Sequence, residues 1–433
     1  MSPSTTPDPQ RRSATFWAIW SVVAAFGTYF CMYGFRKTFT VGTFEGEGFM
    51  GTDFKSVLVI SQVLGYTISK FVGIKIVSEL EPKWRAIAIL VLIGIAEAAL
   101  VLFGILPRPW SLVALFINGL PLGMVFGLVL SFLEGRRLTE ALSAGLCASF
   151  ILAGGFVKSV GQWLVKDLAV SETWMPAAAG ALFTVPLLIG VWMLSRIPPP
   201  TQTDREERAE RAPMNADERW SLFRRLAPGL VMLVIMFVLL TVLRGLRDDF
   251  APELWKALGV AEVPKADFTR SELWVGLICF GFGACFAVLR DNRKAFFGSI
   301  AACIFGFLLL GGTLLAQNAG ALSPMAYMVL IGLGLYIPYV VVHTTVFERL
   351  LAVTREKGNL AFLMYLADSS GYLGYVAIVL GKGVLAKKAN FLDLFTQAAW
   401  ISIGIALVCL VGSWVYFARL QSSPSTVSGP VRA

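Results

Sequence analysis

One charged segment, residues 196–220, interrupts a chain that is otherwise strongly apolar and reads RIPPPTQTDREERAERAPMNADERW. Its three consecutive prolines end the preceding helix, because proline lacks an amide hydrogen and its ring blocks the turn before it. Six apolar blocks precede this segment and six follow it. We therefore predict two six-helix halves, residues 1–195 and 224–433, joined by a linker at residues 196–223.

The composition is that of a membrane protein. Of the 433 residues, 56% are hydrophobic and 15% are charged, with a mean hydropathy of +0.71, whereas soluble domains carry about 25% charged residues. This excludes a soluble enzyme, a disordered protein and a nucleic-acid binder. A span needs about 20 apolar residues, so we predict an all-α membrane protein with twelve transmembrane helices, at 16–35, 56–78, 84–106, 111–133, 141–165, 174–195, 226–246, 272–289, 295–316, 324–347, 358–381 and 394–418.

The distribution of basic residues predicts the orientation, since Lys and Arg concentrate in cytoplasmic loops. Placing the N-terminus inside puts 22 of the 37 Lys and Arg residues in inner segments and 11 in outer segments. We expect both termini in the cytoplasm, with the chain embedded as a monomer in a bacterial inner (plasma) membrane. The lipid bilayer is then a partner and nucleic acid is not.

No catalytic or metal-binding pattern stands out. The six cysteines lie in apolar stretches without a C-x-x-C pair, which favours buried small side chains over metal ligands. There is no nucleotide-binding loop and no pair of acids arranged for catalysis. We expect no cofactor and no enzyme activity. Two six-helix halves are instead typical of secondary transporters, whose substrate binds between the halves near the midplane.

Apart from Lys75 and Arg85, which we count with the inner segments, four cations lie in or directly beside the predicted spans. There each costs at least about 2.5–3.5 kcal/mol and marks a candidate functional site. Arg36 and Arg244 occupy corresponding places in the first and seventh spans. Two guanidinium groups there could hold one small anion from both sides, since each donates two parallel hydrogen bonds. Alternatively, Arg36 reaches the headgroups and Arg244 pairs locally with Asp248 or Asp249.

Lys70 and Lys158 are the other two cations inside spans. Lys70 on the second span and Asp368 on the eleventh are expected to face each other, as a structural clasp, a gate or a proton-sensitive pair. Lys158 follows two glycines in ILAGGFVKSVG. These glycines would admit a close neighbouring helix, and Lys158 then faces either the cavity or a structural partner.

The remaining candidates are a histidine, an acid and several tyrosines. His343, the chain's single histidine, is either a proton carrier or a hydrogen-bonded residue of the helix, and Glu348 is a further candidate for coupling. Tyrosine hydroxyls could donate to a bound oxyanion, or the rings could simply pack. The tyrosines on the same helices include Tyr29, Tyr33, Tyr66, Tyr336 and Tyr339.

Two sequence motifs resemble a known family. The first span contains YFCMYGFRKTF at residues 29–39 and the second contains GYTISKF at residues 65–71. Together with VLRGL at 242–246 and LYIPYV at 335–340, these motifs resemble the organophosphate:phosphate antiporters of the major facilitator superfamily. That family exchanges phosphate esters for inorganic phosphate.

The resemblance implies a role for each matching residue. Arg36 and Arg244 correspond to paired phosphate ligands, and Lys70 to a lysine near them. The pocket tyrosines would be Tyr29, Tyr33, Tyr66 and Tyr336. The expected function is exchange of a small anionic substrate, a phosphate ester or inorganic phosphate. The alternatives are a proton-coupled symporter of an organic anion that uses Asp368, Glu348 or His343, and a receptor or sensor with a transporter fold.

Overall fold

The computed structural model describes residues 9–44, 49, 53–133, 139–198, 216–287, 289, 291–354, 360–385 and 391–422. Within these ranges the chain consists of helices joined by short turns. Most of the predicted linker, residues 199–215, lies outside the described residues. The helices are α1 (Pro9–Met32), α2 (Phe54–Glu79), α3 (Arg85–Ile105), α4 (Ser111–Leu133), α5 (Thr139–Lys166), α6 (Met175–Ser195), α8 (Ala216–Asp249), α9 (Ala251–Ala257), α10 (Lys265–Ala287), α11 (Asn292–Asn318), α12 (Pro324–Val341), α13 (Phe347–Thr354), α14 (Leu360–Leu385) and α15 (Phe391–Ser422).

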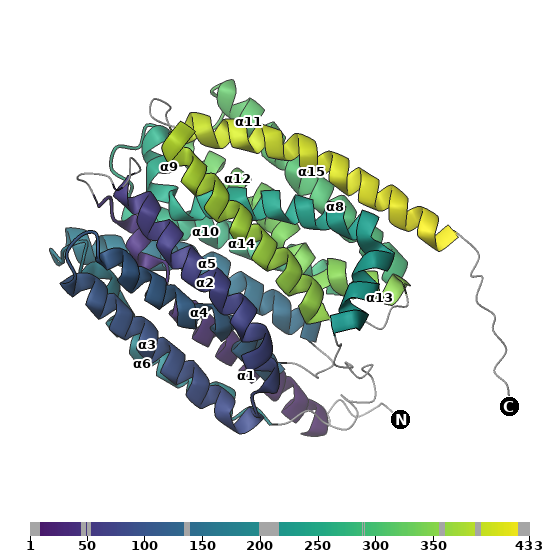
Figure 1. The fold of residues 1–433 in the computed structure, drawn as a ribbon, viewed down its shortest axis with the longest axis horizontal. Helices are drawn as coiled ribbons and strands as arrows, with labels where there is room; N and C mark the ends of the chain where they lie inside the picture. Colours follow the sequence, from purple (N-terminus) through teal and green to yellow (C-terminus); the bar gives the residue numbers. More distant parts are fainter. Residues whose placement is uncertain are drawn as a thin grey trace, which may run out of the picture.

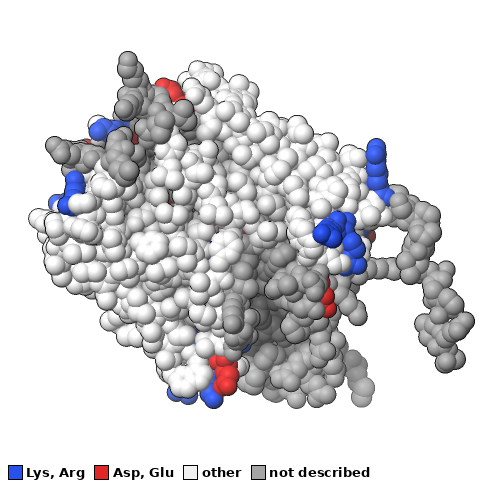
Figure 2. Space-filling view, in the orientation of Figure 1, with Lys and Arg blue, Asp and Glu red and all other residues white. Residues whose placement is uncertain are grey.

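Each predicted apolar block coincides with a long described helix, when α12 and α13 are taken as one continuous span. Ten of the described segments are long and apolar enough to cross a membrane. Helix α8 begins at Ala216, inside the segment that we assigned to the linker. The surface agrees with a bilayer: large apolar side chains such as Val408 and Ile401 are exposed. In Figure 2 the charged side chains lie toward the ends of the helices, with uncharged surface between them.

The helices form two groups that follow the order of the chain (Figure 1). In the first group α1 packs against α5 and α6, while α4 packs against α2 and α3. In the second, α8 packs against α12, α14 and α15, and α11 against α12 and α15. The two groups meet mainly where α5 packs against α10 and where α2 packs against α14. A site between the groups is therefore bounded by these two helix pairs.

Glycines set the spacing of the helices that support this region. A Cβ at Gly119 of α4 would lie 2.2 Å from the carbonyl oxygen of Gln62 on α2, and one at Gly65 of α2 would lie 2.2 Å from that of Phe116 on α4. The predicted close approach beside Lys158 is confirmed, because a Cβ at Gly155 of α5 would lie 2.3 Å from the carbonyl oxygen of Phe268 on α10. Small residues let membrane helices approach to backbone contact.

Two spans are interrupted near the middle of the molecule. After α1 the chain continues as two 3₁₀ turns, η1 (Tyr33–Phe35) and η2 (Thr38–Val41). Between α12 and α13 lies one π-helical turn, η4 (Val342–Val346), which follows Pro338 within α12. Such breaks frequently occur at functional sites. Arg36 and His343 lie in these two interruptions.

Candidate functional site

Arg36 is held between η1 and η2 by contacts from two neighbouring helices. Its backbone carbonyl accepts a hydrogen bond from Nε2 of Gln62 on α2 at 2.9 Å, and Gln62 also donates to Oδ1 of Asn118 on α4 at 2.8 Å. The guanidinium carbon lies 3.7 Å from the centre of the Tyr66 ring. Arg36 is 4% exposed, so it does not reach the headgroups. Stacking uses the face of the guanidinium and leaves its in-plane N–H groups directed elsewhere.

Arg244, near the end of α8, repeats this arrangement in the second group of helices. Its guanidinium carbon lies 4.3 Å from the centre of the Tyr339 ring on α12, and the residue is 6% exposed. Among the described residues, Nε of Arg244 and Nε of Arg36 are both buried without a hydrogen-bond partner. The alternative of a local pair with Asp248 or Asp249 is not observed, because both acids bind lysines.

The two arginines lie around a shared set of tyrosines. The guanidinium carbon of Arg36 lies 5.7 Å from the ring centre of Tyr33 and 6.0 Å from that of Tyr372 on α14. Both Tyr33 and Tyr372 are within electrostatic range of Arg244 as well. Helices α2, α8, α12 and α14 and the segment around η1 thus contribute aromatic rings and positive charge to one buried region between the two groups, which we call the arginine region.

The other buried cations all have acidic partners. In the described part of the chain, an acid lies within 4.0 Å of each remaining buried Lys and Arg, whereas none lies this close to Arg36 or Arg244. The pairs are Lys37 with Asp248 and Asp249, Lys55 with Glu253, Lys70 with Asp368, Lys158 with Asp248, and Arg247 with Glu272. Burying a charge without a partner is costly, so the two arginines stand apart from the other buried cations of the described residues.

The predicted contact between Lys70 and Asp368 is confirmed. Nζ of Lys70 on α2 binds Oδ2 of Asp368 on α14, and Oδ1 of the same acid lies 3.2 Å from Nε2 of His343 in η4. Nζ of Lys70 also lies 5.3 Å from the Tyr66 ring centre and 5.2 Å from that of Tyr372. This cluster therefore adjoins the arginine region and joins the two groups of helices through α2 and α14.

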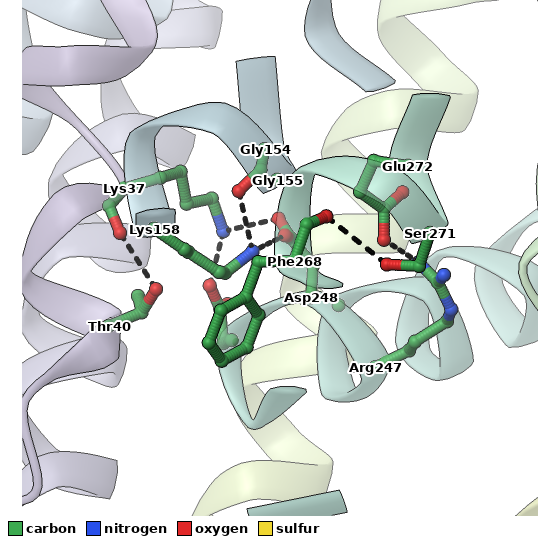
Figure 3. A network of polar contacts seen from close by, with 12 residues as sticks. Lys37, Thr40, Gly154, Gly155, Lys158, Arg247, Asp248, Phe268, Ser271 and Glu272 are labelled. Carbon is green, nitrogen blue, oxygen red and sulfur yellow. Dashed lines mark hydrogen bonds and ion pairs between the residues drawn. The ribbon is translucent and has the colours of Figure 1, made fainter. Parts of the chain in front are cut away.

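A second network joins the groups where α1 and α2 are connected, which we call the α1–α2 end (Figure 3). Lys158 on α5 donates to Oδ1 of Asp248 and, at 3.1 Å, to the carbonyl oxygen of Gly154. Lys37 lies 3.2 Å from Oδ2 of Asp248 and also binds Asp249, which accepts a hydrogen bond from the Tyr375 hydroxyl at 2.8 Å. Of the two alternatives for Lys158, the structure shows the structural partner, because Asp248 neutralises it.

Further polar contacts join the groups at the same end. Nζ of Lys55 on α2 lies 2.5 Å from Oε1 of Glu253 on α9. Lys265 at the start of α10 binds Asp167 just after α5. Arg247 pairs with Glu272 at 2.8 Å and donates to the carbonyl oxygen of Met328, both within the second group. The contacts of Lys55 and Lys265 therefore tie the two groups together at the α1–α2 end.

The remaining predicted residues take different positions. The Tyr29 ring packs on Tyr33 at 5.7 Å, and the Tyr336 ring lies 6.3 Å from that of Tyr339, so both adjoin the arginine region. Glu348 is half-buried in the first turn of α13, beyond His343. Tyr29 and Tyr336 therefore line the same aromatic shell as the stacked tyrosines.

Several site residues escaped the sequence analysis. Tyr372 contacts the Tyr66 ring at 5.1 Å and completes the shell. Lys37, Asp248 and Asp249 form the network at the α1–α2 end, whereas from the sequence we predicted only that Asp248 or Asp249 could pair locally with Arg244. Tyr372 could have been found from its position four residues after Asp368, which puts both residues on one face of the helix.

A metal centre finds no support in the described residues, where no group of three or more His, Cys, Asp or Glu side chains is arranged to hold an ion. All six cysteines are unpaired. Five are buried as expected, but Cys285 on α10 is exposed, because it lies on the outer face of that helix. The site is thus built from cations and aromatic rings.

The fold is that of known membrane transporters. The structure is similar to that of a bacterial homologue of the human drug peptide transporters PepT1 and PepT2, with a TM-score of 0.62, 13% sequence identity, and coverage of 94% of this chain and 99% of the other. It is also similar to a variant of the nucleoside transporter NupG, with a TM-score of 0.58, 15% identity, and coverage of 93% and 100%. The chain is therefore an integral, multi-pass membrane protein with the major facilitator fold, as predicted.

The sequence places the chain in a family. Residues 38–420 match the model of DUF5690, described as a family of unknown function, and the chain belongs to this family. No curated protein matches it in sequence. Since a fold supports many functions, the function has to be argued from the site.

Proposed function

We propose that this protein is a secondary transporter that binds a phosphate ester or inorganic phosphate between Arg36 and Arg244 and exchanges it across the membrane. The observation that carries the proposal is the pair of buried guanidinium groups without an acidic partner among the described residues. Every other buried cation there is neutralised. A bound oxyanion would supply the missing negative charge and accept hydrogen bonds from both arginines.

The charge of the region favours phosphate over a carboxylate. With Lys70 neutralised by Asp368, the two arginines carry two positive charges. A phosphate monoester carries about 1.5 to 2 negative charges near neutral pH, whereas one carboxylate leaves a positive charge uncompensated. The motif resemblance to organophosphate:phosphate antiporters agrees with this choice, as do the positions of Lys70, Tyr29, Tyr33, Tyr66 and Tyr336 around the arginines.

The arrangement of the helices supports alternating access. Arg36 belongs to the first group of helices and Arg244 to the second, so an anion bound to both would draw the groups together. Without an anion, the two positive charges repel each other and disfavour a closed, dehydrated site. This coupling between occupancy and closure favours obligatory exchange. We place both termini in the cytoplasm, as the distribution of basic residues predicts, so the network at the α1–α2 end closes the outer side.

The test is the binding of inorganic phosphate and glycerol 3-phosphate to purified protein by calorimetry, with glycerol and lactate for comparison. We expect both phosphates to bind, and Arg36→Lys or Arg244→Lys to weaken binding by about 10- to 100-fold, because an ammonium cannot replace a bidentate donor. Arg224→Lys is the matched control, since Arg224 is exposed and stacks on Trp220 at 5.0 Å.

Reconstituted vesicles test the transport step. Vesicles loaded with phosphate should take up labelled phosphate much faster than empty vesicles do. Uptake that stays at background while binding persists would indicate a receptor with this fold. Unchanged phosphate affinity in both lysine variants would contradict direct binding by the arginines.

A further inference from the structure

The ring of His343 faces a hydrogen-bond acceptor at each nitrogen. Nδ1 lies 2.9 Å from the backbone carbonyl oxygen of Tyr339, and Nε2 lies 3.2 Å from Oδ1 of Asp368. The ring is 9% exposed and lies within the π-helical turn η4. The wider turn and the preceding Pro338 place it opposite α14 rather than along the regular helical face.

These contacts fix the number of protons on the pair. A carbonyl oxygen only accepts, so Nδ1 carries a hydrogen. A neutral ring then has a lone pair on Nε2, which would oppose the lone pairs of an ionised carboxylate at Oδ1. The observed contact is attractive only when one further proton lies between Nε2 and Oδ1. Asp368 gives its other oxygen to Lys70, and within the described ranges of the chain the group that faces Oδ1 is Nε2 of His343.

Several titratable or charged groups surround the pair. Lys70 comes from α2, Tyr339 from α12 and Tyr372 from α14, while Cys147 on α5 is within electrostatic range of Asp368. Arg244 on α8 stacks on the Tyr339 ring, and Glu348 lies in the first turn of α13. Helices α10 and α11 also pack against η4, but Glu272 of α10 is paired with Arg247, and Arg293 and Lys294 of α11 are exposed.

We infer that His343 and Asp368 together form a proton-binding site that is coupled to the anion site. The ring of His343 lies 4.3 Å from the ring of Tyr339, on which the guanidinium group of Arg244 also stacks. Asp368 binds Lys70, and Lys70 lies beside the ring of Tyr66, on which the guanidinium group of Arg36 stacks. The proton therefore lies on a continuous path of contacts that joins the two arginines.

The coupling has two physical parts. A proton on the pair adds positive charge beside the anion site and so strengthens anion binding; by linkage, the anion strengthens proton binding equally. The proton also gives Asp368 a second cationic partner, which competes with Lys70 and weakens the bridge between α2 and α14. Proton loss leaves the carboxylate with Lys70 as its one cationic partner of the two and tightens that bridge. In the exchange proposed above, the bound anion is thus accompanied by a proton. This part of the inference rests on the proposed function, whereas the proton site itself does not.

The single histidine permits a direct test that needs no substrate. Protein labelled with ¹⁵N-histidine and purified through a tag without histidine gives one pair of imidazole nitrogen signals. At about pH 7, we expect a hydrogen on Nδ1 and Nε2 engaged in a strong hydrogen bond that disappears in Asp368→Asn. Glu262→Gln, at an exposed acid, should leave the spectrum unchanged. A hydrogen on Nε2 alone, or a spectrum that Asp368→Asn does not alter, would overturn the proton site.

Calorimetry in buffers of different ionisation enthalpy tests the coupling, with inorganic phosphate as the probe. In the wild-type protein, phosphate binding should be accompanied by proton uptake beyond that owed to phosphate itself, and His343→Gln should lose this excess. Equal proton uptake in both proteins would refute the coupling. If phosphate and its esters fail to bind at any pH, the proposed function fails, while the spectrum of His343 still decides the proton site.

Discussion

At the scale of single residues, the aromatic rings under the two arginines stabilise them only in part. A cation–π contact contributes about 0.5–2 kcal/mol, whereas removing an ion from water costs several kcal/mol even after relaxation. Tyr66 and Tyr339 therefore orient the guanidinium groups but do not replace a counter-ion. Under the proposed function, the net positive charge that remains selects for anions.

Two substitutions of Tyr66 distinguish the contribution of its ring to phosphate affinity from that of its hydroxyl. Tyr66→Phe keeps the ring 3.7 Å from Arg36 and should leave phosphate affinity nearly unchanged. Tyr66→Leu removes the platform and should weaken affinity by about 3- to 30-fold. Titration of the purified variants with inorganic phosphate measures both. An equal loss in the two variants would show that the hydroxyl binds the anion and that the ring contributes little.

At the scale of helices, hydropathy predicted the spans but not their interruptions. The position and length of an apolar block are fixed by the bilayer thickness, so blocks such as 111–133 matched α4 closely. The 3₁₀ turns around Arg36 and the π turn at His343 depend on partners from other helices, such as Gln62 and Asp368. No local pattern in the sequence reports those partners.

The packing of α2 on α4 positions Tyr66 and can be tested at a glycine. Gly119→Ala places a methyl group 2.2 Å from the carbonyl oxygen of Gln62, so α4 must move away from α2. We expect a lower unfolding temperature in detergent, with a loss of about 1–3 kcal/mol, and weaker phosphate binding. Gly94→Ala on α3 is the control, because its Cβ meets nothing within 4 Å. That change should be neutral or slightly stabilising. Equal effects of both substitutions would contradict the packing argument.

At the scale of the molecule, the sequence predicted which cations are buried better than which charges meet. Insertion cost alone singled out Arg36, Lys70, Lys158 and Arg244, and the positions of the helices brought Lys70 to Asp368. The pairing of Lys158 with Asp248 was not predicted. It depends on how the end of α8 meets α5 across the two groups of helices, which neither helix encodes by itself.

The network at the α1–α2 end should hold the two groups of helices together on that side. Asp248→Asn leaves the buried Lys158 without an acidic partner among the described residues, at a cost on the order of 3 kcal/mol, so this end should open more often. We expect faster amide hydrogen exchange in residues 33–44 and 265–275 and little change in residues 82–90, around the start of α3 at the opposite end. Asp267→Asn, which removes an ion pair within α10, should leave the exchange at both ends nearly unchanged. Faster exchange at both ends of the Asp248 variant would mean that the network stabilises the whole fold and does not act as a gate.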